Sequence, residues 1–424
     1  MNGKADSISA RIFWVALALY LFVLPIANTI AVRNLAFIVL IAVTAAVLVK
    51  ARTMPVLPFA RYWLAYFLVA LVSVVFAVDP RMSLSELRVE VVYCILIFIV
   101  GVTWGGRYVD FEWFAGLLAV INLVLTSASF SVVSGDMLFR DMVRLHPALY
   151  AGLSGNWVLL VMFINVWLAF RLWNSGRKAL SLLLAGLLVL DVWAMMVTSN
   201  RQNMVALGVG MAAAAALLLR MKFNWRRAGL FLGILSVVAA LLAAQLIRRN
   251  PVEIPAQEFT PSVVASLNQV GDVVSATTRS DIRWGLWRFS LEKIGEHPWI
   301  GGGIGRTVFD KLYSEYRPEV PDLWHAHNMI LNKGIQMGIP GMLVFFALWV
   351  ALAMELLRHA RSAGASRYLA TAGFAAMVAT FTKNQTDDFF VRNVALWFWL
   401  VMGLLVGFLR ADAVKVTPSP APGP

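Results

Sequence analysis

Two of the chain's five histidines, His325 and His327, lie two residues apart in segment 324–328. The pKa of an imidazole is close to neutral pH, so a histidine can take a proton from an attacking hydroxyl group. A histidine pair can also bind a metal ion, but no cysteine or carboxylate at ligand spacing accompanies this pair. These residues therefore favour acid–base chemistry without a metal ion or another cofactor.

Four arginines are the second set of chemically capable residues. Arg201 opens an apolar run, Arg279 and Arg283 are four residues apart in a polar segment, and Arg144 precedes another apolar run. Each of them is also compatible with a simpler role as an anchor at the membrane interface. A guanidinium group can form hydrogen bonds to two phosphate oxygens at once. Several such arginines at one end of an apolar bundle therefore favour a multiply anionic ligand such as a lipid-linked pyrophosphate.

Composition indicates that membrane-spanning helices position these residues. Hydrophobic residues make up 60% of the 424 residues, charged residues make up 14%, and the mean hydropathy is +0.75. Such values place the chain outside the range of soluble domains. We predict an all-α polytopic membrane protein, a single integral membrane domain over residues 1–424, with about twelve transmembrane helices. They are expected at 11–32, 34–50, 60–78, 87–104, 109–130, 153–172, 179–198, 201–219, 227–247, 340–357, 367–386 and 390–409.

The loops between these spans predict the orientation. Half of the 36 lysines and arginines fall in one set of loops, which marks the cytoplasmic side and places both termini there. The net charge of +13 is spread over these loops, so nucleic-acid binding is not indicated. One large loop, residues 248–326 between spans nine and ten, is predicted to be periplasmic and to contain short helices, one of them over 280–296. The tail 416–424 is predicted to be disordered.

Two groups of glycines follow the candidate arginines and histidines along the sequence. Gly301, Gly302, Gly303 and Gly305 form a run that we interpret as a tight structural turn rather than a nucleotide-binding loop, because no strand precedes it. Gly338 and Gly341 follow His327 and Asn328 after nine residues, with two residues between the glycines.

The pattern His327, Asn328, nine residues, Gly338, two residues, Gly341 resembles the signature of the O-antigen ligase and polymerase superfamily. Segment 198–201 is similar to that family's element of small polar residues followed by an arginine at the start of a helix. Segment 279–305 resembles its large loop. Asn200 and Gln202 flank Arg201 where a serine and a glycine are more usual in the family.

The resemblance implies an inverting, metal-independent glycosyltransferase of the bacterial inner membrane. It would move a glycan from undecaprenyl pyrophosphate to lipid A-core on the periplasmic face. Its other implied partners are the lipids of the membrane. His327 is implied as the general base, and Arg201 and Arg279 as pyrophosphate ligands. Four further residues are predicted from their own positions as possible substrate contacts: Asn328, Arg144, Arg283 and Asp388. Gly338 and Gly341 are predicted to be structural glycines.

Three alternatives remain for the reaction. An O-antigen polymerase extends the glycan on its own carrier, a protein O-oligosaccharyltransferase transfers it to protein, and a transporter moves the lipid-linked glycan across the membrane. Protein-directed relatives usually carry extra C-terminal sequence, whereas this chain stops about fifteen residues after the last span. Transporters need charges along a central path, whereas the arginines here are predicted at helix ends. The ligase is therefore favoured.

Overall fold

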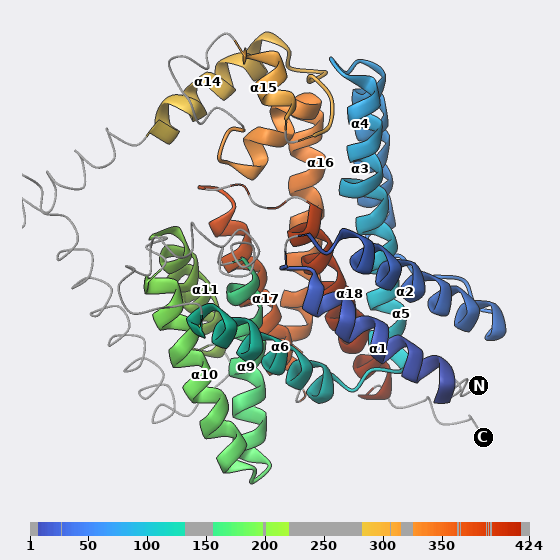
Figure 1. Ribbon diagram of the computed structural model, residues 1–424, viewed down its shortest axis with the longest axis vertical. Coiled ribbons are helices and arrows are strands. Elements are labelled where there is room, and N and C mark those ends of the chain that lie inside the picture. Colours follow the sequence, from blue (N-terminus) through green and yellow to red (C-terminus); the bar gives the residue numbers. More distant parts are fainter. Residues whose placement is uncertain are drawn as a thin grey trace, which may run out of the picture.

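The structure is a computed structural model, and it describes residues 7–26, 28–131, 156–197, 201–219, 282–305, 307–314, 325–362, 364, 366–386, 388, 390 and 392–416. Every element of the described part is a helix (Figure 1). The elements are α1 (Ser7–Val23), α2 (Ile30–Lys50), α3 (Ala60–Val75), α4 (Pro80–Leu87), the π-helical segment η1 (Arg88–Val92), α5 (Tyr93–Arg107), α6 (Phe111–Ser131), α9 (Asn156–Asn174), α10 (Lys178–Val197), α11 (Arg201–Leu219), α14 (Ile282–Glu296), α15 (Val308–Leu312), α16 (Met329–Ala360), α17 (Ser366–Lys383) and α18 (Arg392–Val416).

Six helices of the described part are long and apolar enough to cross a membrane, and three shorter ones are also apolar. Eleven of the twelve predicted spans coincide with helices. The ninth, 227–247, lies outside the described residues, as do most of loop 248–326 and residues 417–424 of the tail. The chain is therefore a membrane protein with multiple helical spans.

Two predicted boundaries differ from the structure. The predicted span 11–32 is interrupted, because α1 ends at Val23 just before Pro25, which has no N–H for a helical hydrogen bond. The hydroxyl of Thr29 donates to the carbonyl oxygen of Val23 at 2.9 Å and satisfies the end of α1. The tenth predicted span began at residue 340, whereas α16 starts eleven residues earlier, at Met329.

Helices α5 and α18 make the most extensive helix–helix contact in the described part of the chain. Gly101 and Gly105 on α5, and Gly403 and Gly407 on α18, share a spacing of four residues and lie in the contact. A Cβ atom at Gly101 would be 2.7 Å from the carbonyl oxygen of Leu400, so only glycine permits this approach. Small residues at such spacing allow backbones of membrane helices to pack directly.

An aromatic cluster fills the space where α3, α5, α16 and α18 meet. The ring centroids of Trp63 and Trp399 are 4.7 Å apart, and those of Trp349 and Phe398 are also 4.7 Å apart. All four residues are at most 2% exposed. Because aromatic packing of this kind is rigid, α16 has a fixed position against the bundle.

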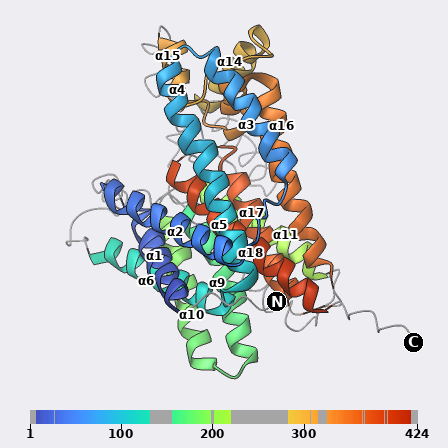
Figure 2. The same ribbon diagram turned by 90° about the vertical axis from the view of Figure 1, so that its right-hand side faces the viewer.

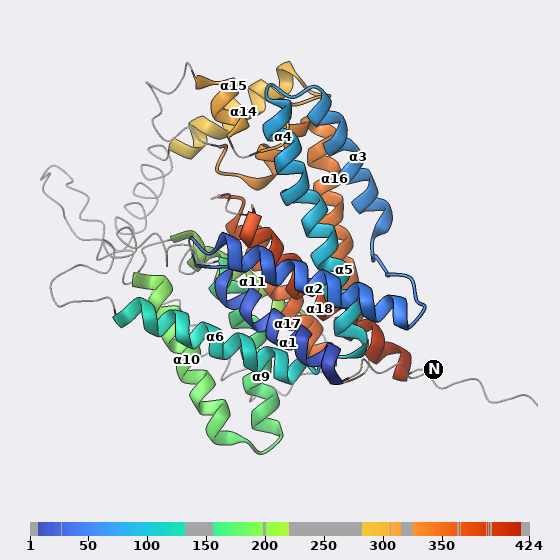
Figure 3. The same cartoon turned by 45° about the vertical axis from the view of Figure 1, so that its right-hand side comes forward.

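Helices α14 and α15 lie at the end of the bundle where α4 and α16 begin, which is the upper end in Figure 1. Figure 2 and Figure 3 show the same arrangement from two other sides. The turn between α9 and α10 lies at the opposite end (Figure 1). The predicted loop helix 280–296 is confirmed as α14.

Candidate functional site

The start of α16 forms the centre of the candidate site. Asn328 is the N-cap residue: its backbone is extended, and its side-chain oxygen accepts hydrogen bonds from the N–H groups of Ile330 at 2.9 Å and Leu331 at 3.0 Å. Its amide nitrogen donates to the carbonyl oxygen of Gln385 at 3.0 Å. The substrate contact predicted for Asn328 stays a prediction. Because the side-chain oxygen accepts the two capping bonds, that contact would have to use the second hydrogen of the amide nitrogen.

His327, directly before this cap, has a left-handed backbone with φ of 48°. Residues other than glycine adopt this conformation rarely, and it costs about 1–2 kcal/mol. The side chain is half-buried, and its ring centroid is 4.2 Å from that of His325, with an angle of 40° between the rings. The turn therefore holds His327 in a conformation that surrounding contacts must stabilise.

Those contacts come from buried polar groups on either side of the turn. The side-chain oxygen of Asn332 accepts a hydrogen bond from the N–H of Ala326 at 2.8 Å, and its nitrogen donates to Asp388. Asp388 also accepts from the N–H of Phe390 at 3.1 Å. Asp388 is only 2% exposed and lies in the segment after α17. Through Asn332, its carboxylate stabilises the turn. Its predicted substrate contact stays a prediction.

Helix α16 is broken at Gly338, which ends the helical segment 329–337 that follows the turn. Gly338 has φ of 69° and ψ of −171°, and a Cβ atom there would be 2.7 Å from the carbonyl oxygen of Pro298. Pro340 has no N–H to bond the helix carbonyl four residues before it. The break therefore leaves backbone donors and acceptors without helical partners, and each needs another partner when buried.

The glycine run of the loop supplies these partners. The N–H groups of Gly302 and Gly303 donate to the carbonyl oxygens of Ile335 at 2.9 Å and Gln336 at 3.0 Å. In return, the N–H of Ile339 donates to the carbonyl oxygen of Pro298 at 2.7 Å. Two N–H groups of the run are thus used inside the protein, which agrees with its interpretation as a structural turn. Gly341 is the second glycine of the motif, and a Cβ atom added to it would be 3.1 Å from the carbonyl oxygen of Lys333.

A buried ion pair fixes the same segment from its other side. Nζ of Lys333 lies 2.8 Å from Oε2 of Glu90 and 3.0 Å from Oε1 of Gln336, and both charged side chains are at most 5% exposed. Glu90 belongs to η1, where the helix widens into π geometry, a feature that is frequent at functional sites. About one helical turn before Glu90, Glu86 of α4 pairs with Arg392 at the start of α18.

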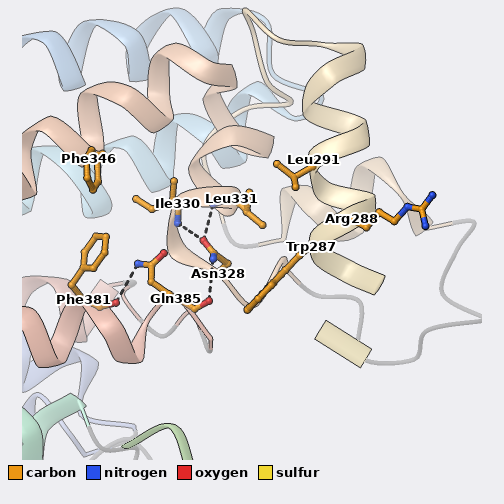
Figure 4. Close-up of a pocket in the computed structure, with 9 residues that line it drawn as sticks. All are labelled: Trp287, Arg288, Leu291, Asn328, Ile330, Leu331, Phe346, Phe381 and Gln385. Atoms are coloured by element: carbon orange, nitrogen blue, oxygen red, sulfur yellow. Dashed lines mark hydrogen bonds between the residues drawn. The ribbon is translucent and has the colours of Figure 1, made fainter. Parts of the chain in front are cut away.

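A pocket of about 570 Å³ opens beside the cap (Figure 4). Helix α14 contributes Trp287, Arg288 and Leu291. Helices α16 and α17 with the residues next to them contribute Asn328, Ile330, Leu331, Phe346, Phe381 and Gln385. The walls are mostly apolar, with the amides of Asn328 and Gln385 among them, and the guanidinium group of Arg288 points away from the pocket (Figure 4). A pocket of this composition suits a ligand with an apolar chain and a polar group.

The first residues of α11 come to the same end of the bundle. A Cβ atom at Gly210 would be 2.9 Å from the carbonyl oxygen of Ala375 and from Cβ of Ala379, so α11 packs directly on α17. Helix α11 begins at the end where α17 finishes (Figure 1). Arg201 is nine residues before Gly210, or about 13 Å along the helix. The start of α11 is therefore level with segment 384–386, which contacts the start of α16.

The structure describes the predicted arginines only in part. Arg201 is the first residue of α11 and Arg283 belongs to α14, but their side chains are not described. Arg144 and Arg279 lie outside the described residues. The pyrophosphate ligands named from the sequence therefore stay predictions.

Several residues of the site were not found from the sequence. Glu90 lies in the predicted span 87–104, where a charged side chain is a general signal of function that could have been used to find it. Lys333 precedes the predicted span 340–357 and gave a weaker signal. Arg288 is five residues after Arg283, and Asn332 and Gln385 gave no signal before the structure brought them to the turn. Within the described part of the chain, no group of three or more histidine, cysteine or acidic residues could hold a metal ion.

Comparison with protein families matches residues 186–346 to the model described as O-antigen ligase, so this chain carries a domain of that family. The matched region includes Arg201, Arg279, His327, Gly338 and Gly341. Membership implies glycan transfer of ligase or polymerase type with a lipid-linked glycan substrate. Comparison with curated proteins finds no significant match.

Proposed function

We propose that this chain, whose residues 186–346 form an O-antigen ligase family domain, is an O-antigen ligase. It transfers a glycan from undecaprenyl pyrophosphate to a sugar hydroxyl of lipid A-core in lipopolysaccharide biosynthesis. The observation that carries this proposal is the braced turn at the start of α16. It holds the half-buried His327 directly before Asn328, and Asn328 lines a pocket with mostly apolar walls.

In the proposed reaction, His327 accepts the proton of the attacking hydroxyl group. The new bond forms from the acceptor oxygen to C1 of the glycan, and the bond from C1 to the pyrophosphate oxygen breaks. Attack from the face opposite the leaving group inverts the configuration at C1. A base held in position contributes a factor of about 10²–10⁴ to such a reaction.

The leaving pyrophosphate carries negative charge, which Arg201 and Arg279 are proposed to bind. Fixed cationic donors lower the energy of a transition state in which charge develops on the leaving group. The start of α11 supports this role for Arg201, because it is level with the segment that contacts Asn328. No divalent ion is then required to neutralise the leaving group.

The pocket supports a polyprenyl donor. Trp287, Phe346 and Phe381 provide apolar surface for the first isoprene units. A fully water-soluble nucleotide sugar gains nothing from these apolar walls.

The proposed orientation places this site on the periplasmic face of the inner membrane, with both termini in the cytoplasm. Arg171, Arg177 and Lys178 lie around the α9–α10 turn, at the end of the bundle away from α14 (Figure 1). Cations in short loops mark the cytoplasmic side. Helix α1 starts and α18 ends nearer to this end than to α14.

Product analysis tests the proposal. Purified protein in nanodiscs is incubated with undecaprenyl-pyrophosphate-linked glycan and lipid A-core, with and without EDTA. We expect glycosylated core and free undecaprenyl pyrophosphate in equal amounts, with the same rate in EDTA. A longer carrier-linked glycan would identify a polymerase instead, and a glycan joined to added protein would identify an oligosaccharyltransferase. Movement of donor between leaflets without any product would identify a transporter. Loss of activity in EDTA would refute the metal-independent mechanism.

A further inference from the structure

The hydrogen bond between the two neighbouring histidines defines the protonation state of the first. The backbone N–H of His327 lies 3.0 Å from Nδ1 of His325. A backbone N–H can only donate, so Nδ1 of His325 must be the acceptor and carries no proton. His325 is therefore neutral in this arrangement, with its proton on Nε2.

This bond closes the turn at the residue that has the unfavourable backbone conformation. His327 has φ of 48°, and its N–H points back to the side chain two residues earlier. Asparagine side chains often make the same bond to the N–H two residues later, and they stabilise turns in this way. In this chain an imidazole ring takes the place of the asparagine amide.

His325 is itself held firmly. The side chain is 2% exposed, and the next residue, Ala326, is tied through Asn332 to Asp388. The rings of the two histidines are in contact, with centroids 4.2 Å apart. A displacement of His325 would therefore be transmitted to both the backbone and the ring of His327.

We propose that His325 is the positioning residue for the catalytic base. Its unprotonated Nδ1 accepts the hydrogen bond that holds His327 in the left-handed conformation, and this conformation aims the His327 imidazole at the acceptor hydroxyl. This inference rests on the proposed role of His327 in glycan transfer. His325 does not exchange a proton with substrate, and it acts through the backbone of His327.

Two substitutions separate positioning from general structural support. His325→Asn keeps an acceptor atom near the position of Nδ1 and can bond the N–H two residues later. His325→Leu has similar bulk and no acceptor. Because misplacing a catalytic group by about 1 Å can cost about 10²-fold in rate, we expect His325→Leu to lower kcat by about 10- to 100-fold. The KM for the lipid-linked donor should change less than about threefold, and His325→Asn should recover most of kcat.

The hydrogen bond can be observed without any activity assay. The chain has only five histidines, so ¹⁵N-histidine labelling in nanodiscs, with single substitutions for assignment, resolves His325. We expect its ¹⁵N shifts to show the neutral tautomer protonated on Nε2. A proton on Nδ1 would overturn the inference.

Kinetics provide the second decision. If the wild type transfers glycan to lipid A-core and His325→Leu matches its kcat, His325 does not position the base. Equal losses of kcat in His325→Asn and His325→Leu at unchanged thermal midpoints would also overturn the inference. If the wild type itself forms no glycosylated core, the proposed function fails, and that result is separate from any comparison of the variants.

Discussion

Nζ of Lys333 and Oε2 of Glu90 lie 2.8 Å apart in the interior of the helical bundle, although 243 residues separate them in sequence. Lys333 belongs to the segment of α16 between the His327 turn and the break at Gly338, and Glu90 belongs to the π-helical segment η1. The pair therefore connects the candidate site to the α5–α18 pair. Charges at this depth are costly unless each has its partner.

Removal of one member of this pair should destabilise the protein strongly. Lys333→Met leaves the Glu90 carboxylate buried without its partner, and we expect a loss of about 3–5 kcal/mol in the free energy of unfolding. The double variant Lys333→Met with Glu90→Gln should recover part of that loss. The thermal midpoint of the detergent-purified protein measures both effects. Lys293→Met is the control, because its pair with the more exposed Glu296 is worth about 0–1 kcal/mol. A double variant no more stable than Lys333→Met would contradict this account.

His327→Ala should lose transfer while it retains its fold. We expect the rate of glycosylated-core formation to fall by about 10²–10⁴, with donor binding retained, because the general base is lost and the binding groups remain. His297→Ala, at an exposed position beyond α14, is the control and should transfer normally. A normal rate in His327→Ala would exclude it as the base.

Arg201→Lys and Arg279→Lys should each lose most transfer although both keep a positive charge. A bidentate contact with phosphate needs the planar guanidinium fork, which lysine lacks. Transfer in cells, normalised to the amount of protein in the membrane, measures the effect. Arg177→Lys, in the exposed turn between α9 and α10, is the matched control. Three equally active variants would make Arg201 and Arg279 interface anchors.

Gly338→Ala should disturb both stability and transfer. Alanine at φ of 69° is strained, and its Cβ atom would approach the carbonyl oxygen of Pro298, which bonds Ile339. We expect a loss of about 1–3 kcal/mol and a lower transfer rate, because the docked loop would have to shift. Gly285→Ala on α14 is the control: in the part of the chain that the structure describes, nothing outside the neighbouring residues of its own helix lies within 4 Å of its Cβ position, and alanine should stabilise the helix by about 0.5–1 kcal/mol. An unchanged thermal midpoint in Gly338→Ala would mean that the break does not depend on glycine.

The ion pair of Asp79 with Lys311 should make the attachment of α15 sensitive to acid. The hydrogen bond from Lys311 lowers the pKa of the Asp79 carboxyl below its usual value of 3.8. A carboxyl with a lowered pKa contributes stability above its unfolded pKa, and this contribution is lost as the pH falls through the folded pKa. Asp79→Asn keeps the acceptor that caps α4 at the N–H of Met82 but removes the charge.

The difference in thermal midpoint between wild type and Asp79→Asn should therefore be constant from pH 7 to about pH 5 and shrink below about pH 4. The same titration with added salt should reduce the difference, because the pair is partly exposed. A difference that grew towards low pH would show that the charge pair is not the cause.

The local pattern of the sequence determined most of the helices. An apolar run of about twenty residues has to bond its backbone internally within a membrane, so composition alone predicted eleven helices of the described part. The spacing of His327, Gly338 and Gly341 was also a local signal, and it identified the segment that carries the candidate base. The cap at Asn328 was visible in principle, since an asparagine directly before an apolar run favours an N-cap, although it was interpreted as a substrate contact.

Only the tertiary structure decided how this segment is held. The break at Gly338 frees the carbonyl oxygens of Ile335 and Gln336, and their partners, Gly302 and Gly303, come from a loop more than thirty residues earlier. Likewise, Glu90 and Lys333 are charged side chains that are costly to bury alone, and each is buried beside the other. Such contacts depend on where two distant segments meet. The hydropathy and spacing of either segment alone do not contain that information, because the energy belongs to the pair.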